Sequence, residues 1–309
     1  MPDISRNDVA TLIQEAYAAD LLTSATQGST VLSAFSTVPM GTKITHLPVL
    51  ATLPEAGWVG ESATAPEGVK PQSKVTWQDR TLVAEEVAVI IPVHENVLDD
   101  ATTNVIEEIT KSAGQAIGKK LDQAVLFGVD KPASWVSPAL HPAAVAASQA
   151  FGVTTGKANE NDLVGASNKA AKAIAEAGWL PDTLLSSIAL RYEVANLRDA
   201  NGNPIFRDES FNGFTTHFNR NGAWNAAAAN ALLVDSSRIK IGVRQDIEVK
   251  FLTEATLGID NPATAFSLAE RDMVALRFKA RYAYVLGTAA TAAGTNMVPV
   301  AAVVPGSGS

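Results

Sequence analysis

Residues 75 to 93 read V-T-W-Q-D-R-T-L-V-A-E-E-V-A-V-I-I-P-V, and this stretch decides the fold. Apolar side chains recur on one parity, while polar ones such as Thr76, Arg80 and Glu86 recur on the other. A period of two is typical of a strand with one buried face. If it were unbroken, the strand would extend roughly 60 Å at about 3.3 Å per residue. That length exceeds what a compact domain usually needs, so we expect an extended arm.

The segment before this strand predicts its partner. Prolines and glycines recur from Pro39 to Pro92 and almost exclude a helix. Residues 43–50 and 57–61 can fold back along the strand as a projecting two-stranded hairpin. Such a hairpin has little core of its own, and isolated hairpins are marginal in water. We therefore expect it to lie on another protein surface.

After the strand the apolar period changes to three and four. Residues 102–127 carry an apolar stripe that includes Ile106, Ile109, Ile117 and Leu121, with acidic residues early and lysines late. This pattern predicts the longest helix of the chain, closed by Gly128 as its C-cap. We expect its stripe to pack on the sheet that contains residues 273–286.

The remaining segments predict a mixed α+β protein. Residues 5–22 are typical of a short amphipathic helix behind Ser5, and residues 162–178 of a second helix capped by Asp162. Residues 129–161 are interpreted as a loop-rich connection. Strands are predicted at residues 183–188, 232–235, 239–243, 247–252 and 273–286, with a helix at 190–198. The uncharged tail after Leu286 is expected to lie on neighbouring protein.

The amino-acid composition disfavours several classes of function. The 309 residues hold 24 Lys and Arg against 32 Asp and Glu, a formal charge of −8, which disfavours a grip on nucleic acid. Only 18% of residues are charged, so much of the surface should be hidden by assembly. Zero cysteines exclude disulfides and thiolate chemistry. The N-terminus lacks the apolar run of a signal peptide, and no segment reads as a membrane span, so synthesis in a cytoplasm is expected.

Motifs for catalysis or metal binding are incomplete. His46, His94, His141 and His217 lie far apart, and none has the spacing of a helical metal pair. Residues 152–157 lack a residue that a phosphate-binding loop requires, and residues 60–64 lack one that a nucleophile elbow requires. Residues 199–204 likewise lack a residue that a calcium loop requires. We expect no catalytic residue, cofactor or metal. A hydrolase with an unrecognised, scattered site remains a remote alternative.

Several segments, taken in order, resemble one family. They are A-G-W-V-G-E at 56–61, P-E at 66–67, the strand ending in I-P-V-H-E-N-V-L-D-D at 91–100, the long helix to Gly128, L-R-D-A-N-G-N-P-I-F at 197–206, the segment 239–252, and E-R-D-M-V-A-L-R at 270–277 followed by Arg281-Tyr282. This succession resembles the tailed-bacteriophage major capsid proteins with the Hong Kong 97 fold. The resemblance covers nearly the whole chain, and its weight lies in order and spacing.

The resemblance implies an α+β capsid fold with four parts. These are an N-terminal arm (1–38), an extended loop hairpin (39–95), a peripheral domain with a spine helix (96–180 and 266–309) and an axial domain (181–265). It further implies self-assembly through pentamers and hexamers into an icosahedral shell around phage DNA, formed in the host cytoplasm and present in the virion. An encapsulin-like nanocompartment shell shares the fold and stays open as an alternative.

The resemblance also implies partners and contact residues. The partners are further copies of the chain, a separate scaffolding protein, a portal and a decoration protein. The packaged double-stranded DNA would be held without sequence-specific contact, and no membrane is involved. Assembly contacts are expected at Trp58, Glu61 and Trp77.

Some members of the family join subunits by an isopeptide bond between a loop lysine and an asparagine. Lys70 and Lys74 are the loop lysines here, and Asn261 is the nearest acceptor in the corresponding late region. Attack requires a lysine that burial has deprived of its proton. Because the residues between the two lysines are polar, we expect solvated or ion-paired lysines rather than a crosslink.

Overall fold

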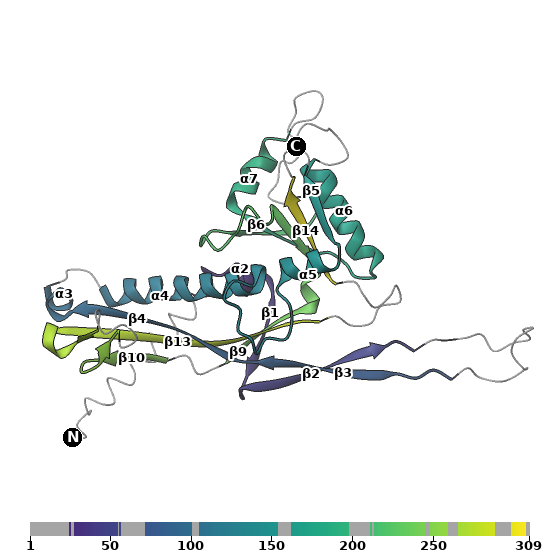
Figure 1. The fold of residues 1–309 in the computed structure, drawn as a ribbon. Coiled ribbons are helices and arrows are strands. Elements are labelled where there is room, and N and C mark those ends of the chain that lie inside the picture. The colour runs from purple at the N-terminus through teal and green to yellow at the C-terminus, as the bar shows by residue number, and fades with distance from the viewer. Residues whose placement is uncertain are drawn as a thin grey trace, which may run out of the picture.

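A computed structural model of the protein describes residues 25, 28–54, 56, 72–100, 105–153, 162–197, 211, 213–244, 248–258, 265–287 and 298–306. Figure 1 shows a long helix, α4, above a sheet of long strands, a second sheet flanked by helices, and a hairpin that projects to one side. The helix predicted at residues 5–22 lies outside the described residues.

Strand β13 (Met273–Leu286) is the centre of the first sheet. It pairs antiparallel with β4 (Glu85–His94), β10 (Glu248–Leu252) and β9 (Ile239–Arg244). Strand β9 also pairs in parallel with β1 (Ser36–Met40). The predicted bounds of this strand, 273–286, are confirmed. Its alternating pattern gives one face to the core and leaves charged residues on the other.

Helix α4 (Val105–Asp122) covers the inner face of this sheet. Its Ile117 and Leu121 are buried in one cluster with Phe278 and Tyr282 of β13, as the apolar stripe predicted. The helix continues through a π-helical turn, Gln123–Phe127, to Gly128, whose φ of 75° is the left-handed conformation expected of a glycine C-cap. A separate short helix, α3 (Glu95–Asp100), precedes it.

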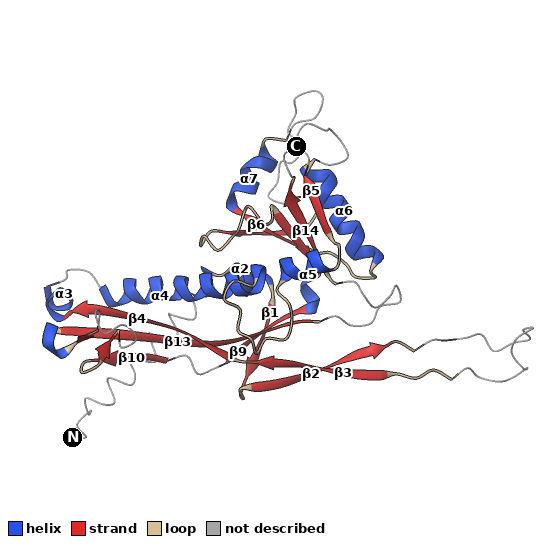
Figure 2. Cartoon of the chain, in the orientation of Figure 1, coloured by secondary structure: helices blue, strands red, loops and turns tan. Residues whose placement is uncertain are grey.

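The strand predicted at residues 75–93 divides at Ala84. Before this residue, β3 (Thr76–Val83) pairs with β2 (Ile44–Thr52), and after it β4 pairs with β13. Ala84 is buried, and its N–H donates to Lys43 O at 2.8 Å. The chain therefore leaves one sheet for another at this point. The hairpin ends at Val83 rather than at residue 95, and Figure 2 shows it extending away from the body.

The second sheet has the order β5-β14-β8-β6-β7. Its strands are β5 (Ala150–Val153), β14 (Val300–Pro305), β8 (Ala231–Val234), β6 (Thr183–Ser187) and β7 (Thr215–Asn219). Helices α5 (Leu140–Ala146), α6 (Leu163–Glu176) and α7 (Ile188–Ala195) pack beside it, and a short helix, α2 (Thr30–Ala34), lies between it and α4. Asp162 caps α6 as predicted, since its carboxylate accepts from Gly165 N at 2.7 Å.

Two predictions about this region are wrong. Residues 129–161 were expected to be a loop-rich connection, but they contain α5 and β5. The tail after Leu286 was expected to lie on neighbouring protein, but its residues 300–305 form β14, buried inside this sheet of the same chain. A short uncharged segment of Val and Ala suits a strand with both neighbours in place.

The sheets cross the sequence boundaries that were expected for the domains. β5, α6 and β14 lie with β6 and β8, although they were expected in the other part of the chain. Conversely, β9 and β10 pair with β13 rather than with the strands of residues 181–235. Strand pairing joins segments far apart in sequence, and local periodicity carries no signal for it. Two minor strands, β11 (Thr256–Leu257) and β12 (Phe266–Ser267), form a separate pair.

Candidate assembly surfaces

The hairpin β2–β3 presents apolar side chains to solvent. Trp77 on β3 is 67% exposed, and Ile44 and Val75 are about half exposed. The His46 ring and the Asp79 carboxylate are in hydrogen-bonding contact across the two strands, both well exposed. A tryptophan left in water forfeits a large burial free energy, and a two-stranded hairpin cannot build a core around it. The hairpin therefore offers a surface suited to another protein.

The structure describes the positions of two of the six residues expected at contacts or crosslinks. Trp77 is exposed on the hairpin, and Lys74 is exposed in the segment just before β3. The remaining four, Trp58, Glu61, Lys70 and Asn261, lie outside the described residues. The structure therefore does not describe both members of any lysine–asparagine pair that was expected to crosslink.

A buried carboxylate, Asp122 at the end of α4, ties residues 29–31 to the helix and to the end of β7. One of its oxygens accepts from Ser29 Oγ at 2.6 Å and Val31 N at 3.1 Å. The other accepts from Thr30 N at 2.9 Å and from two side-chain amides. These are Asn219 Nδ2 at 3.0 Å and Asn221 Nδ2 at 2.8 Å. The cluster joins α2, the end of α4 and the end of β7.

Burial controls the ionisation of this carboxylate. Asp122 is completely buried, and removal from water raises its pKa, although the hydrogen bonds from Ser29, Thr30 and Val31 act in the opposite direction. An acceptor with this many donors holds its neighbours firmly in place. We call the five donors and Asp122 the arm clamp, because they fix residues 29–31 to the body.

The sequence interpretation missed the arm clamp, although one signal was present. Asp122 stands among the buried positions of the helix, four residues after the buried Gly118, where an apolar residue is the ordinary choice and an unpaired carboxylate is costly. An aspartate there needs donors from elsewhere in the fold. Those donors come from segments about ninety residues before it and after it.

The face of the first sheet turned away from α4 carries paired charges. Glu248 on β10 accepts from Arg277 at 3.0 Å and lies 2.8 Å from Lys279, both on β13. The hydrogen bond from Lys279 leads the effects that lower the pKa of Glu248. Arg281 reaches Glu86 of β4 at 3.3 Å. These pairs are partly exposed, so each contributes little to stability by itself.

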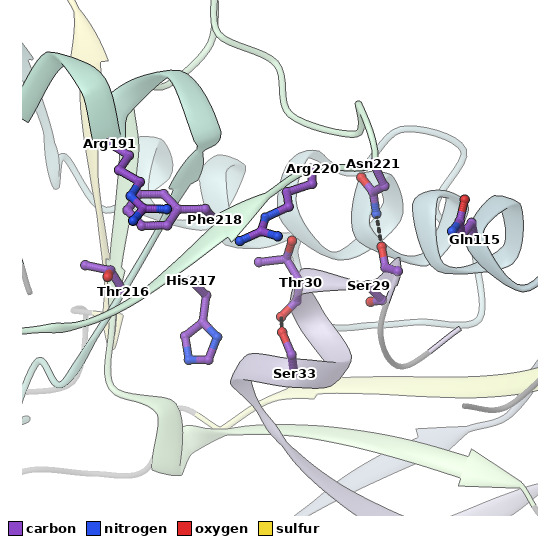
Figure 3. Close-up of a pocket in the computed structure, with 11 residues that line it drawn as sticks. Ser29, Thr30, Ser33, Gln115, Arg191, Thr216, His217, Phe218, Arg220 and Asn221 are labelled. Atoms are coloured by element: carbon purple, nitrogen blue, oxygen red, sulfur yellow. Dashed lines mark hydrogen bonds between the residues drawn. The ribbon is translucent and has the colours of Figure 1, made fainter. Parts of the chain in front are cut away.

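A polar cavity of about 540 Å³ opens beside the arm clamp. Figure 3 shows His217, Arg220 and Thr30 around it, with Arg191 at one side. Burial lowers the pKa of His217, which favours its neutral form. Among its described lining residues there is no carboxylate that could serve as a base beside a hydroxyl nucleophile. Across the described chain, no three His, Asp or Glu side chains gather to share a metal ion.

The order of strands, the long helix and the projecting hairpin can be set beside known proteins. The family model described as "Phage capsid family" matches residues 10–292. The chain belongs to the phage capsid family. Its function is that of a phage major capsid protein, and the encapsulin-like alternative is not favoured. No curated protein matches the chain.

Solved structures agree with this family over the full length. A structure from Mycobacterium phage Adephagia is 68% identical, with 99% of each chain covered and a TM-score of 0.82. One from Mycobacterium phage Cain is 69% identical, with 99% of this chain and 100% of that chain covered and a TM-score of 0.82. One from Microbacterium phage Oxtober96 is 35% identical, with 98% of this chain and 99% of that chain covered and a TM-score of 0.78. The mixed helix-and-sheet fold is thus that of phage capsid structures, and the chain is a subunit of a multimeric shell in the virion.

Within the described part of the chain, no helix combines the length and the hydropathy that crossing a bilayer requires.

Proposed function

We propose that the chain forms an icosahedral shell of pentamers and hexamers with the Hong Kong 97 fold, and that the shell encloses double-stranded phage DNA. The first sheet with α4 would then be the peripheral domain and spine helix, and the second sheet with α5 to α7 the axial domain. The hairpin β2–β3 would be the extended loop. Residues 28–34 would be the end of the N-terminal arm.

One observation carries this proposal: the hairpin projects from the body and leaves Trp77 on β3 67% exposed. In a shell such an element gains its stability from the neighbouring subunit, which provides the missing face. The arm clamp supports the same function, since it fixes the arm where it leaves the body. Low charge and the apolar contacts of the hairpin suit extensive burial between copies.

The exposed apolar side chains of the hairpin support a structural role without catalysis. We propose that the shell assembles in the host cytoplasm with a separate scaffolding protein and a portal, and that it can bind decoration proteins. The net charge of −8 suits a container that releases its DNA, so contact with the packaged duplex would be weak and independent of sequence.

For the loop lysines we propose solvated or ion-paired positions at subunit contacts rather than isopeptide bonds. Lys74 is exposed in the described chain, whereas attack on an asparagine requires an amine that burial has deprived of its proton. A protonated amine has no lone pair with which to attack an asparagine.

Deleting residues 52–72, the outer part of the hairpin, tests the proposed function. The subunit should keep its circular dichroism spectrum and its melting temperature, because the two large buried clusters include no residue of β2 or β3. Shells should no longer form, as seen by electron microscopy and light scattering. Shells of unchanged size and yield from this deletion would show that the hairpin plays no part in assembly.

A further inference from the structure

The loop that joins Gly128 to α5 presents two apolar side chains to solvent, Val129 in part and Val136 almost fully. Val136 is 86% exposed, the largest exposed fraction among the large apolar residues of the described chain. Its two neighbours behave in the opposite way, since Trp135 and Ser137 are buried. The loop thus has an ordered base and a projecting valine.

Lys131 holds the backbone on both sides of this valine. Its ammonium donates to Trp135 O and, at 2.9 Å, to Ser137 O. Partial burial lowers the pKa of Lys131, so the loop bears a cost for placing a cation there. Because both carbonyls bind the same ammonium, the backbone on either side of Val136 is fixed and the valine lies at the tip of the loop.

Three further hydrogen bonds fix the loop to the body. Trp135 Nε1 donates to Val83 O at 3.0 Å, the Tyr284 hydroxyl donates to Pro138 O at 3.0 Å, and Leu286 N donates to Ser137 Oγ at 3.2 Å. The first of these reaches the end of β3, so the loop is continuous with the base of the hairpin. Burial raises the pKa of Tyr284, which keeps its hydroxyl a donor.

We propose that Val136 is a contact residue between two copies of this chain, seated against an apolar surface of the second copy. The inference rests on the proposed shell function. Inside its own subunit a side chain at this exposure packs against almost nothing, yet its loop is held rigidly. Rigid presentation reduces the entropy that binding would otherwise cost. A second copy is the occupant that a shell of one chain supplies, directly beside the hairpin base.

The absence of cysteine from the sequence allows a direct test. Val136→Cys introduces a single thiol of similar size and polarity, and Val145→Cys on α5, half exposed in the subunit, is the matched control. Each purified chain is labelled with a maleimide as dispersed subunits and as oligomers formed without other proteins. The thiol at position 136 should react about tenfold more slowly in the oligomers, while the control reacts at equal rates.

The outcomes separate this inference from the proposed function. A chain that stays monomeric by light scattering, both alone and with its scaffold, contradicts both. Oligomers in which the thiol at position 136 reacts as fast as in the subunit contradict only the inference. The same holds if a different protein protects the thiol while the chain remains monomeric, because the occupant would then not be a second copy.

A charge at the same position gives an independent measurement. Val136→Asp should leave the melting temperature of the subunit unchanged and raise the concentration needed for assembly about tenfold, because the contact would bury an unpaired carboxylate. Val145→Asp should leave that concentration unchanged. Assembly of Val136→Asp at the wild-type concentration would overturn the inference.

Discussion

Replacing Asp122 with alanine would empty the centre of the arm clamp. Five donors from two segments, the start of α2 and the end of β7, would lose their acceptor: Ser29 Oγ, Thr30 N, Val31 N, Asn219 Nδ2 and Asn221 Nδ2. Each buried donor that is left without an acceptor costs about 1–3 kcal/mol. Ser29 and Asn221 also line the polar cavity, so water can satisfy part of the loss. We therefore expect the free energy of unfolding to fall by about 3 kcal/mol, well below the sum over all the donors.

Urea unfolding of unassembled subunits, followed by circular dichroism at neutral pH, measures this loss. Ser29→Ala is the matched control, because it removes one donor to the carboxylate together with the cap hydrogen bond from Leu32 N, and it should cost about 1–2 kcal/mol. Beyond stability, Asp122→Ala should free the arm, and limited proteolysis should then cleave near residues 28–31. If Asp122→Ala cost no more than Ser29→Ala and left the arm protected, the carboxylate would not be the centre of the clamp.

Four further results are expected. Burial raises the pKa of Asp122, so its contribution to stability is fully present at low pH and declines as the pH rises from about 4 through the folded pKa; the stability of wild type relative to Asp122→Asn should decrease along that titration, and a constant difference would contradict this. Ile117→Asp places an unpaired charge in the core beneath α4 and should unfold the subunit at a cost of several kcal/mol, so a soluble variant that assembles would refute the packing. Glu248→Gln removes a screened surface pair and should change stability by about 1 kcal/mol or less in urea unfolding, whereas a larger loss would mean that the pair is buried in the subunit. Particles boiled in detergent should give one band near 32.3 kDa on a denaturing gel, and a ladder that disappears with Lys74→Ala would establish a crosslink.

Local periodicity predicted the elements whose pattern is set by one buried face. The bounds of β13, the stripe of α4 with Ile117 and Leu121, the cap at Asp162 and the glycine at position 128 were all present in the sequence. Each depends on residues within a few positions of one another. Elements of this kind are specified by side-chain alternation and by caps, which act over a single turn or strand.

The arrangement of these elements could not be predicted in the same way. β14 lies between β5 and β8 in the second sheet, and its pairing with segments far away in sequence left no local pattern. The break at Ala84 was missed for a related reason, since β3 and β4 continue as extended backbone while their partners change. The arm clamp joins three distant segments, and the exposed Val136 is unusual only once its loop is seen to be fixed.

The order of motifs in the sequence nevertheless indicates the family without any knowledge of how the strands pair. Residues 56–61, 91–100 and 270–277 resemble capsid proteins as a succession, and the match over residues 10–292 agrees. The order of these segments along the chain can be recognised even where the pairing of the strands cannot be predicted.

Electron microscopy of the purified chain, expressed alone and with its scaffold, tests the central claim most directly. The proposed function predicts closed icosahedral particles, or rings of five or six subunits where closure is incomplete, with the hairpin of each subunit lying on its neighbour. A population that contains only separate subunits of 32.3 kDa at every concentration, with and without the scaffold, would contradict it.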